Sequence, residues 1–170
     1  MKKLFLIFGM CAATTILTAQ DTIRFTWKGG VNKRFIIGCT GGSQITVKWG
    51  DATPDTIIAD PGYMPTVYHS YNDTNNYEVT IIGDPSIPLF VFGTLNCSMS
   101  QISDLKLSNN STLQYLDCSS NQLTNLVLGS NLQTLYCWGN QLPLSDLYAA
   151  SLLVSNRNNK RLGHQFLPIR

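Results

Sequence analysis

The feature that most constrains this 170-residue chain is a pattern of apolar residues and cysteines that repeats between residues 90 and 143. Residues 92–97 (FGTLNC) recur 21 positions later as residues 113–118 (LQYLDC), and again 19 positions after that as residues 132–137 (LQTLYC). A turn of about 20 residues cannot bury its own apolar face, so such turns stack and share one core. The repeat therefore predicts a stack of about three chain turns.

The repeated pattern is L-x-x-L-x-C-x-x-N-x-L, which resembles the leucine-rich repeat and implies a short solenoid over residues 85–143. Asn121 and Asn140 stand where each turn bends, and their amides are expected to satisfy backbone groups there. Cys97, Cys118 and Cys137 are expected to form a buried ladder inside the stack, as small apolar side chains. A redox or metal site is the alternative for these cysteines, but they lack paired C-x-x-C spacing. We expect no metal and no cofactor.

Residues between the inward positions are expected to face solvent on the strand surface of the repeats. They include Tyr115, Asp117 and Ser119 in the second copy, and Tyr136 and Trp138 in the third. Exposed aromatic side chains beside an acid are typical of a recognition patch. Tyr115, Asp117, Tyr136 and Trp138 are therefore the candidate ligand-binding residues. Alternatively, the aromatic rings only cover the edge of the core or pack against the C-terminal segment.

The N-terminal half has a different pattern, with short runs of alternating apolar and polar residues. These runs cover residues 22–27, 34–39, 45–49 and 77–82, and turn residues such as Gly29-Gly30 separate them. Strands at this spacing predict a β-sandwich over residues 21–84. The fold class is therefore mainly β, with an immunoglobulin-like sandwich followed by the repeats.

Residues 47–56 (VKWGDATPDT), 69–71 (HSY) and 76–83 (NYEVTIIG) resemble a PKD-type immunoglobulin-like domain, with Ala52 in place of a glycine of the W-G-D-G-T motif. We expect Trp49 to fill the space between the sheets. Tyr71 is expected at the start of a late strand, with its hydroxyl bonded to backbone, and Asp51 is expected to accept backbone N–H groups in the turn. A PKD-like domain followed by leucine-rich repeats is similar to exported surface proteins of Bacteroidota. This resemblance implies non-catalytic adhesion, or binding of carbohydrate or protein.

Residues 1–20 read as a signal peptide, because Lys2 and Lys3 precede an apolar core and a small-residue exit near Ala19. Lipid attachment at Cys11 is an alternative that the residues before it fit poorly. Lys2 and Lys3 account for the whole net charge of +2, which leaves ten basic and ten acidic residues in the rest of the chain. The balance gives no electrostatic support for nucleic-acid binding. We expect an exported protein, secreted or on the cell surface, with no membrane insertion after cleavage.

Residues 144–170 are expected to cap the open end of the repeats. A helix is predicted to begin at residues 143–145, where a proline and a serine suit a first turn, and to end near residues 154–156. A polar turn is predicted over residues 158–163, followed by a final apolar piece at residues 166–169. A chain that stops shortly after such a cap also suits a truncated version of something longer.

Catalytic groups are sparse. His69, Asp51 and Ser70 are the residues from which a triad can be imagined, but no oxyanion-hole or nucleophile motif accompanies them. We expect no enzyme activity and assign no catalytic residue. The function predicted from the sequence is an exported binding or adhesion module that recognises a protein or glycan through the strand face of the repeats. The alternative is a structural spacer or a remnant of a larger surface protein.

Overall fold

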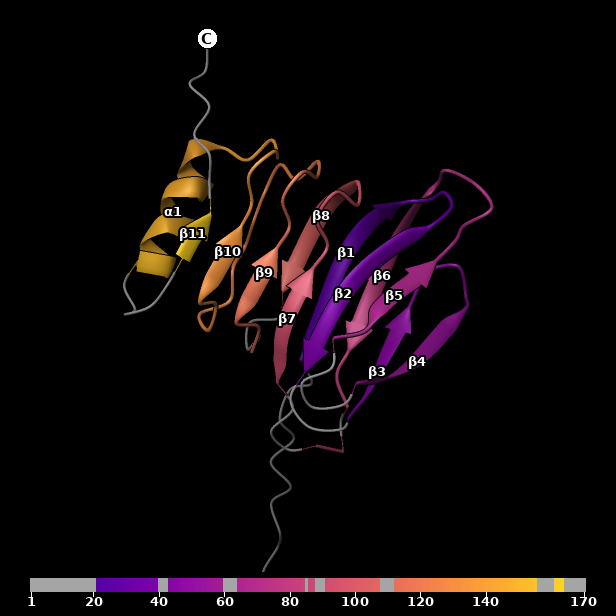
Figure 1. Cartoon of the computed structure of the whole chain (residues 1–170). Coiled ribbons are helices and arrows are strands. Elements are labelled where there is room, and N and C mark those ends of the chain that lie inside the picture. Colours follow the sequence, from indigo (N-terminus) through magenta and orange to yellow (C-terminus); the bar gives the residue numbers. More distant parts are fainter. Residues whose placement is uncertain are drawn as a thin grey trace, which may run out of the picture.

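The computed structural model describes residues 21–39, 43–59, 64–84, 86–87, 91–107, 112–155 and 161–163. The predicted signal peptide and the apolar piece at residues 166–169 lie outside this part. The described chain is mainly β, and its helix lies at one end of the strand array (Figure 1). In chain order the elements are β1 (Thr22–Lys28), β2 (Lys33–Cys39), β3 (Ser43–Lys48), β4 (Pro54–Ala59), β5 (Thr66–His69), β6 (Asn76–Ile82), β7 (Phe92–Asn96), β8 (Ile102–Leu107), β9 (Tyr115–Asp117), β10 (Thr134–Tyr136), α1 (Leu144–Ser155) and β11 (Arg161–Gly163).

The described strands form two sheets that share one core (Figure 1). The five-stranded sheet has the order β4-β3-β6-β1-β8, and the six-stranded sheet has the order β11-β10-β9-β7-β2-β5. The five-stranded sheet is antiparallel throughout. In the six-stranded sheet, β7 is antiparallel to β2 and parallel to β9, and the parallel pairing continues through β10 to β11. The two halves of the chain are thus joined by hydrogen-bonded strands, β1 to β8 and β2 to β7.

Strand β1 shows why these residues form a half-buried strand. Ile23, Phe25 and Trp27 alternate with Arg24 and other polar residues, and the burial alternates with them. Successive side chains of a strand point to opposite faces, so this pattern gives one apolar face to the core and one polar face to solvent. The sequence predicted this strand correctly.

Four aromatic side chains fill the space between the two sheets. Phe25, Trp27 and Trp49 come from the five-stranded side, and Phe35 comes from β2 of the six-stranded sheet. The Phe35 ring lies 5.8 Å from that of Phe25 and 5.9 Å from that of Trp49, measured between centroids. Trp49 is fully buried, as the sequence predicts. These tilted and edge-on contacts hold the two sheets together.

The three copies of the repeat lie in register in the six-stranded sheet. Leu95 of β7 is the partner of Leu116 of β9, which in turn is the partner of Leu135 of β10. All three leucines are fully buried. The opposite side of the stack also aligns, because Lys106 forms a parallel bridge with Val127. The in-register stacking predicted from the 21- and 19-residue offsets is therefore present in the fold.

Cys97, Cys118 and Cys137 follow these leucines by two residues and point into the same core. All three are buried and free, and none forms a disulfide. Burial raises the pKa of Cys97 to about 12, and it also raises the pKa values of Cys118 and Cys137. The thiols are therefore protonated at neutral pH and act as small apolar groups.

Asn121 and Asn140 bind backbone groups at the bends of the stack, as predicted. The Asn140 amide oxygen accepts the N–H of Leu123 at 3.0 Å, and its nitrogen donates to the carbonyls of Cys118 and Cys137. Asn121 makes the equivalent bonds one turn earlier and is the more buried of the two. Each amide joins two successive turns of the chain, since its partners lie on both.

Two local predictions are wrong, and two strands were missed. Strands β4 and β5 were not predicted, because β4 begins at a proline and its two isoleucines are adjacent rather than alternating, and β5 is only four residues long. Tyr71 does not start a strand but follows β5 by two residues. Residues 161–163, predicted to lie in a polar turn, form β11, because the free edge of β10 offers a parallel partner.

Helix α1 agrees with its predicted bounds. It begins after Pro143, whose carbonyl accepts the N–H groups of Asp146 and Leu147. The Asp146 carboxylate also accepts the N–H of Leu126 at 3.2 Å, which ties the first helical turn to the preceding chain turn. Among the described residues, no helix combines the length and the apolar character that crossing a bilayer requires.

Candidate functional site

The outer surface of the six-stranded sheet presents side chains from both halves of the chain in straight rows. One row crosses five strands through Thr66, Ile36, Asn96, Asp117 and Tyr136, each the register partner of the next. All five are exposed or half-buried, while their strand neighbours point into the core. The surface predicted from the repeats alone therefore continues without a break onto strands β2 and β5.

At the repeat end of this surface the structure brings the rings of Tyr115 and Tyr136 into contact, and Trp138 follows Tyr136 by two residues. We call Tyr115, Tyr136 and Trp138 the aromatic patch. The rings of Tyr115 and Tyr136 lie 5.8 Å apart between centroids and are tilted by 50°. Both tyrosines are half-buried, and Trp138 is 46% exposed. The two tyrosine rings thus offer contact area that is already held in place by strands β9 and β10.

Asp117 lies beside the aromatic patch, but half of its carboxylate is used within the chain. Its Oδ1 accepts both the N–H and the hydroxyl of Ser119, at 3.0 and 2.6 Å. Ser119 was predicted to face solvent, and this is wrong because it is only 2% exposed. Strand β9 ends at Asp117, so the alternation of faces stops there. The second carboxylate oxygen of Asp117 is the atom that a ligand would meet.

The environment of Tyr115 keeps its hydroxyl protonated. Burial raises the pKa of Tyr115 above its usual value of 10, and the nearby Asp117 and Tyr136 raise it further. A protonated phenol can both donate and accept a hydrogen bond. The aromatic patch therefore combines ring faces with polar tips, which suits a ligand that carries hydroxyl or carbonyl groups.

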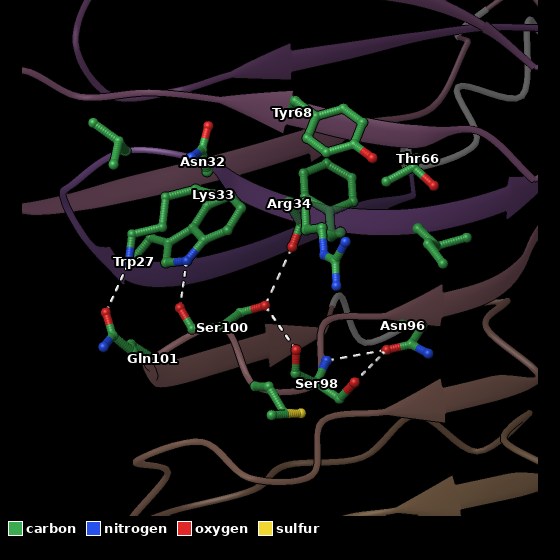
Figure 2. Close-up of a pocket in the computed structure, with 14 residues that line it drawn as sticks. Trp27, Asn32, Lys33, Arg34, Thr66, Tyr68, Asn96, Ser98, Ser100 and Gln101 are labelled. Atoms are coloured by element: carbon green, nitrogen blue, oxygen red, sulfur yellow. Dashed lines mark hydrogen bonds between the residues drawn. The ribbon is translucent and has the colours of Figure 1, made fainter.

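The other end of the surface holds a groove that sequence reasoning missed. It has a volume of about 590 Å³ and lies where β2, β5 and β7 meet (Figure 2). Arg34 and Tyr68 are its most prominent side chains, and Tyr68 is 61% exposed. The alternation of residues 34–39 placed Arg34 on the outer face, which was the available signal. Its neighbour Tyr68 was missed because strand β5 was missed.

Hydrogen bonds fix the walls of this groove. The Trp27 indole N–H donates to the carbonyl of Ser100 at 2.5 Å, and the Ser100 hydroxyl contacts the carbonyl of Arg34 at 3.2 Å. The Lys33 ammonium donates to the side-chain oxygen of Gln101 at 2.7 Å. These bonds join the sandwich strands to the first turn of the repeats, so the groove is held at the junction between them (Figure 2).

His69, the histidine considered for catalysis, packs against the ring of Trp49 and bonds to the carboxylate of Asp51. His69 stacks on Trp49 with ring centroids 4.4 Å apart and planes at 7°, and its Nε2 lies 2.8 Å from Asp51 Oδ2. Asp51 also accepts the N–H of Thr53 at 3.0 Å, as predicted for this turn. The Tyr71 hydroxyl donates to the carbonyl of Trp49 at 2.8 Å, which agrees with its predicted backbone bond.

The imagined triad of His69, Asp51 and Ser70 is not supported by these contacts. The hydroxyl oxygen of Ser70 accepts the backbone N–H of Asn32 at 3.1 Å. The Nε2 atom of His69 is the one directed at Asp51, so it does not serve as a base for Ser70. The described residues hold no group of three or more His, Cys, Asp or Glu side chains placed to bind a metal ion.

No protein-family model matches the chain, and no curated protein or solved structure matches it either. The outer surface of the six-stranded sheet is therefore the candidate functional site.

Proposed function

We propose that this chain is an exported, non-catalytic module that binds a protein or glycan through the outer surface of the six-stranded sheet. The observation that carries the proposal is the contact between Tyr115 and Tyr136, whose rings meet at 5.8 Å on adjacent parallel strands. Aromatic side chains held by regular strands lose little conformational freedom on binding. Interfaces also concentrate their binding energy in tyrosine and tryptophan.

The finer architecture is part of the same proposal. Residues 85–143 are proposed to form a short leucine-rich-repeat solenoid, which the in-register leucines and the two bridging asparagines support. Residues 21–84 are proposed to form a PKD-like sandwich, which the buried Trp49 and the Tyr71 hydroxyl bond support. Residues 144–170 are proposed as the cap. In a repeat protein the exposed strand surface is a common place for recognition.

Export through a signal peptide at residues 1–20 is proposed on the sequence pattern described above. Expression of the full chain in a bacterial host that exports proteins tests it directly. The N-terminal sequence of the exported product should begin at residue 20 or 21. A product that stays in the cytoplasm and retains Lys2 and Lys3 would count against it.

The binding proposal is tested with the folded chain from residue 21 onward on glycan and protein arrays. The double variant Tyr115→Ala, Tyr136→Ala is expected to lose most of the signal of any ligand that the wild type retains. Each tyrosine contributes on the order of 1–2 kcal/mol in an interface of this kind, so the two together should weaken binding at least tenfold.

Tyr148→Ala is the matched control, because Tyr148 is an exposed tyrosine on α1 and lies outside the sheet surface. It should leave binding unchanged. Equal binding by a folded double variant would remove the aromatic patch from the proposal. If the wild type retains no ligand on either array, the alternative of a structural spacer is favoured instead.

A further inference from the structure

The groove between β2, β5 and β7 contains a cationic group without an acidic partner. Arg34 is exposed on β2, and within the described part of the chain no carboxylate forms an ion pair with its guanidinium. Its neighbour Lys33 donates one hydrogen bond to the side chain of Gln101 and adds a second positive charge to the groove. A guanidinium presents paired N–H donors in a fork that matches the two oxygens of a carboxylate.

A second side chain of the groove is suited to hold the body of a ligand. Tyr68 is the register partner of Arg34 across β5 and β2, so the two side chains lie next to each other on the outer face. In Figure 2 the Arg34 side chain lies between Tyr68 on one side and Ser98 and Asn96 on the other. A ligand that places an acidic group on Arg34 would therefore rest its adjoining surface against the Tyr68 ring.

The third side of the groove supplies neutral hydrogen-bonding groups. The side-chain oxygen of Asn96 accepts the N–H and the hydroxyl of Ser98, at 3.1 and 2.8 Å. The amide nitrogen of Asn96 is then the atom left to donate to a ligand. Arg34, Tyr68 and Asn96 all line one hollow of about 590 Å³. This combination fits a sugar ring that carries a carboxylate.

We propose that the groove binds a uronic-acid unit of an acidic polysaccharide, with Arg34 on the carboxylate and Tyr68 on the sugar ring. This inference rests on the proposed binding function and names its ligand class. The polysaccharide would continue along the sheet surface to the aromatic patch. Four interstrand spacings separate β5 from β10, which is roughly 19 Å and requires a chain of several sugars rather than a single one.

The position of the Asp117 charge is compatible with a polysaccharide that runs from Arg34 to the aromatic patch. Asp117 lies two strands from Arg34, a separation of roughly 10 Å, which is close to the screening length at ordinary salt. A carboxylate bound at Arg34 would therefore feel little repulsion from Asp117. The same acid disfavours a second carboxylate directly at the aromatic patch, so neutral sugars or hydroxyl-rich units are expected there.

The position of the groove favours a polysaccharide over an acidic peptide. Extended peptides usually bind to a sheet at an edge strand, where free backbone groups extend the ladder. Arg34 lies on β2, one strand inside the edge strand β5, and neighbouring strands already occupy the backbone groups of β2 and β7. Recognition on this surface must come from ring faces, amides and the guanidinium, which are groups that contact sugars well.

The test measures binding of the folded chain from residue 21 onward to polygalacturonate oligosaccharides by isothermal titration. The same oligosaccharides with methyl-esterified carboxylates are the neutral comparison. Wild type should prefer the acidic form by about tenfold or more, since a hydrogen-bonded charge pair of this kind is lost on esterification. Arg34→Gln should remove that preference, and Arg34→Lys should restore only part of it because the fork is gone.

Arg24→Gln is the matched control, because Arg24 is an exposed arginine on the five-stranded sheet, on the opposite face of the molecule. It changes the net charge equally and should leave the preference intact. Equal binding of the acidic and esterified forms by wild type would overturn the inference and leave the proposed function standing. Tighter binding of poly-glutamate than of polygalacturonate would overturn it in favour of a peptide. Absence of binding to every glycan and protein probe would overturn both.

Discussion

The side-chain oxygen of Asn121 accepts the backbone N–H of Ser100, 21 positions earlier in the chain, at 3.0 Å. The same oxygen accepts the N–H of Ile102, and the amide nitrogen donates to the carbonyls of Cys97, Cys118 and Ser119. Asn121→Ala removes all five of these bonds, and of the carbonyls those of Cys118 and Ser119 still accept from Asn140 and from the N–H of Met99. We expect a loss of about 3 kcal/mol in the free energy of unfolding, measured by urea titration.

Asn140→Ala and Asn125→Ala are the comparison variants for Asn121→Ala. Asn140 makes fewer bonds and is less buried, so Asn140→Ala should cost roughly 1–2 kcal/mol. Asn125 is exposed, and Asn125→Ala should change stability by less than about 0.5 kcal/mol. Similar losses for Asn121 and Asn125 would show that the bridging amide does not stabilise the stack.

Ala52 has a backbone φ of 67°, in the left-handed region that side chains with a Cβ disfavour. It occupies the position where the W-G-D-G-T pattern has glycine. Ala52→Gly should therefore raise the free energy of unfolding by about 1 kcal/mol. Ala149→Gly is the opposite control, because Ala149 is exposed within α1, where glycine should cost about 1 kcal/mol. Thermal unfolding of both variants should give shifts of opposite sign.

The Asp51 carboxylate links stability to acidic pH. Burial alone raises the pKa of Asp51, but hydrogen bonds from Thr53 and His69 outweigh it and the pKa is lowered. The unfolded chain then binds a proton more readily than the folded one, so this contribution is present at neutral pH and is lost as the pH falls below about 4. The group is partly exposed, so the effect should be under about 1 kcal/mol.

Asp51→Asn should therefore lower stability more at pH 7 than at pH 3, measured by urea unfolding at both values. Asp104→Asn is the control, since Asp104 forms an ion pair with the exposed Lys106. A constant difference between Asp51→Asn and wild type at both pH values would contradict the linkage.

The buried thiols link stability to alkaline pH with the opposite sign. Burial raises the pKa of Cys97 from 9.0 to about 12, so the folded chain keeps a proton that the unfolded chain releases. Stability contributed by this thiol is present below about pH 9 and falls as the pH rises above it. Between pH 8 and pH 10 the loss should be roughly 1 kcal/mol for Cys97.

Urea unfolding at pH 8 and pH 10 in the presence of a reducing agent measures this loss. Cys97→Ala should show a smaller change between the two pH values than wild type, although it is less stable at both because of the cavity left behind. An identical change in the variant would mean that Cys97 does not contribute to the pH dependence.

Much of the fold could be predicted from residues that repeat or alternate along the sequence. The offsets of 21 and 19 residues placed Leu95, Leu116 and Leu135 in register, because stacking requires identical residues at identical places. The alternation of Phe25 and Trp27 with polar residues predicted strand β1. The bridging role of the asparagines followed from their position at the bends.

Other features depend on tertiary partners that local sequence does not reveal. Strand β11 exists because β10 has a free edge, and its three residues carry little strand preference of their own. The groove at Arg34 and Tyr68 needs the pairing of β2 with β5 and with β7, which brings together residues more than 30 positions apart. The aromatic patch was predicted because its members share one repeat pattern, whereas the groove combines two patterns.

The six-stranded sheet changes at β7 from antiparallel pairing with β2 to parallel pairing with β9, so beyond β7 each chain turn contributes one strand to the outer surface. Every chain turn inserted between β9 and β10 would add one strand, about 4.8 Å, and would leave the groove at the junction untouched. The N-terminal strands would then stay the same, while the number of chain turns would set the length of the surface. Under the proposed function, chains with different numbers of turns would bind ligands of different lengths that share the same end group.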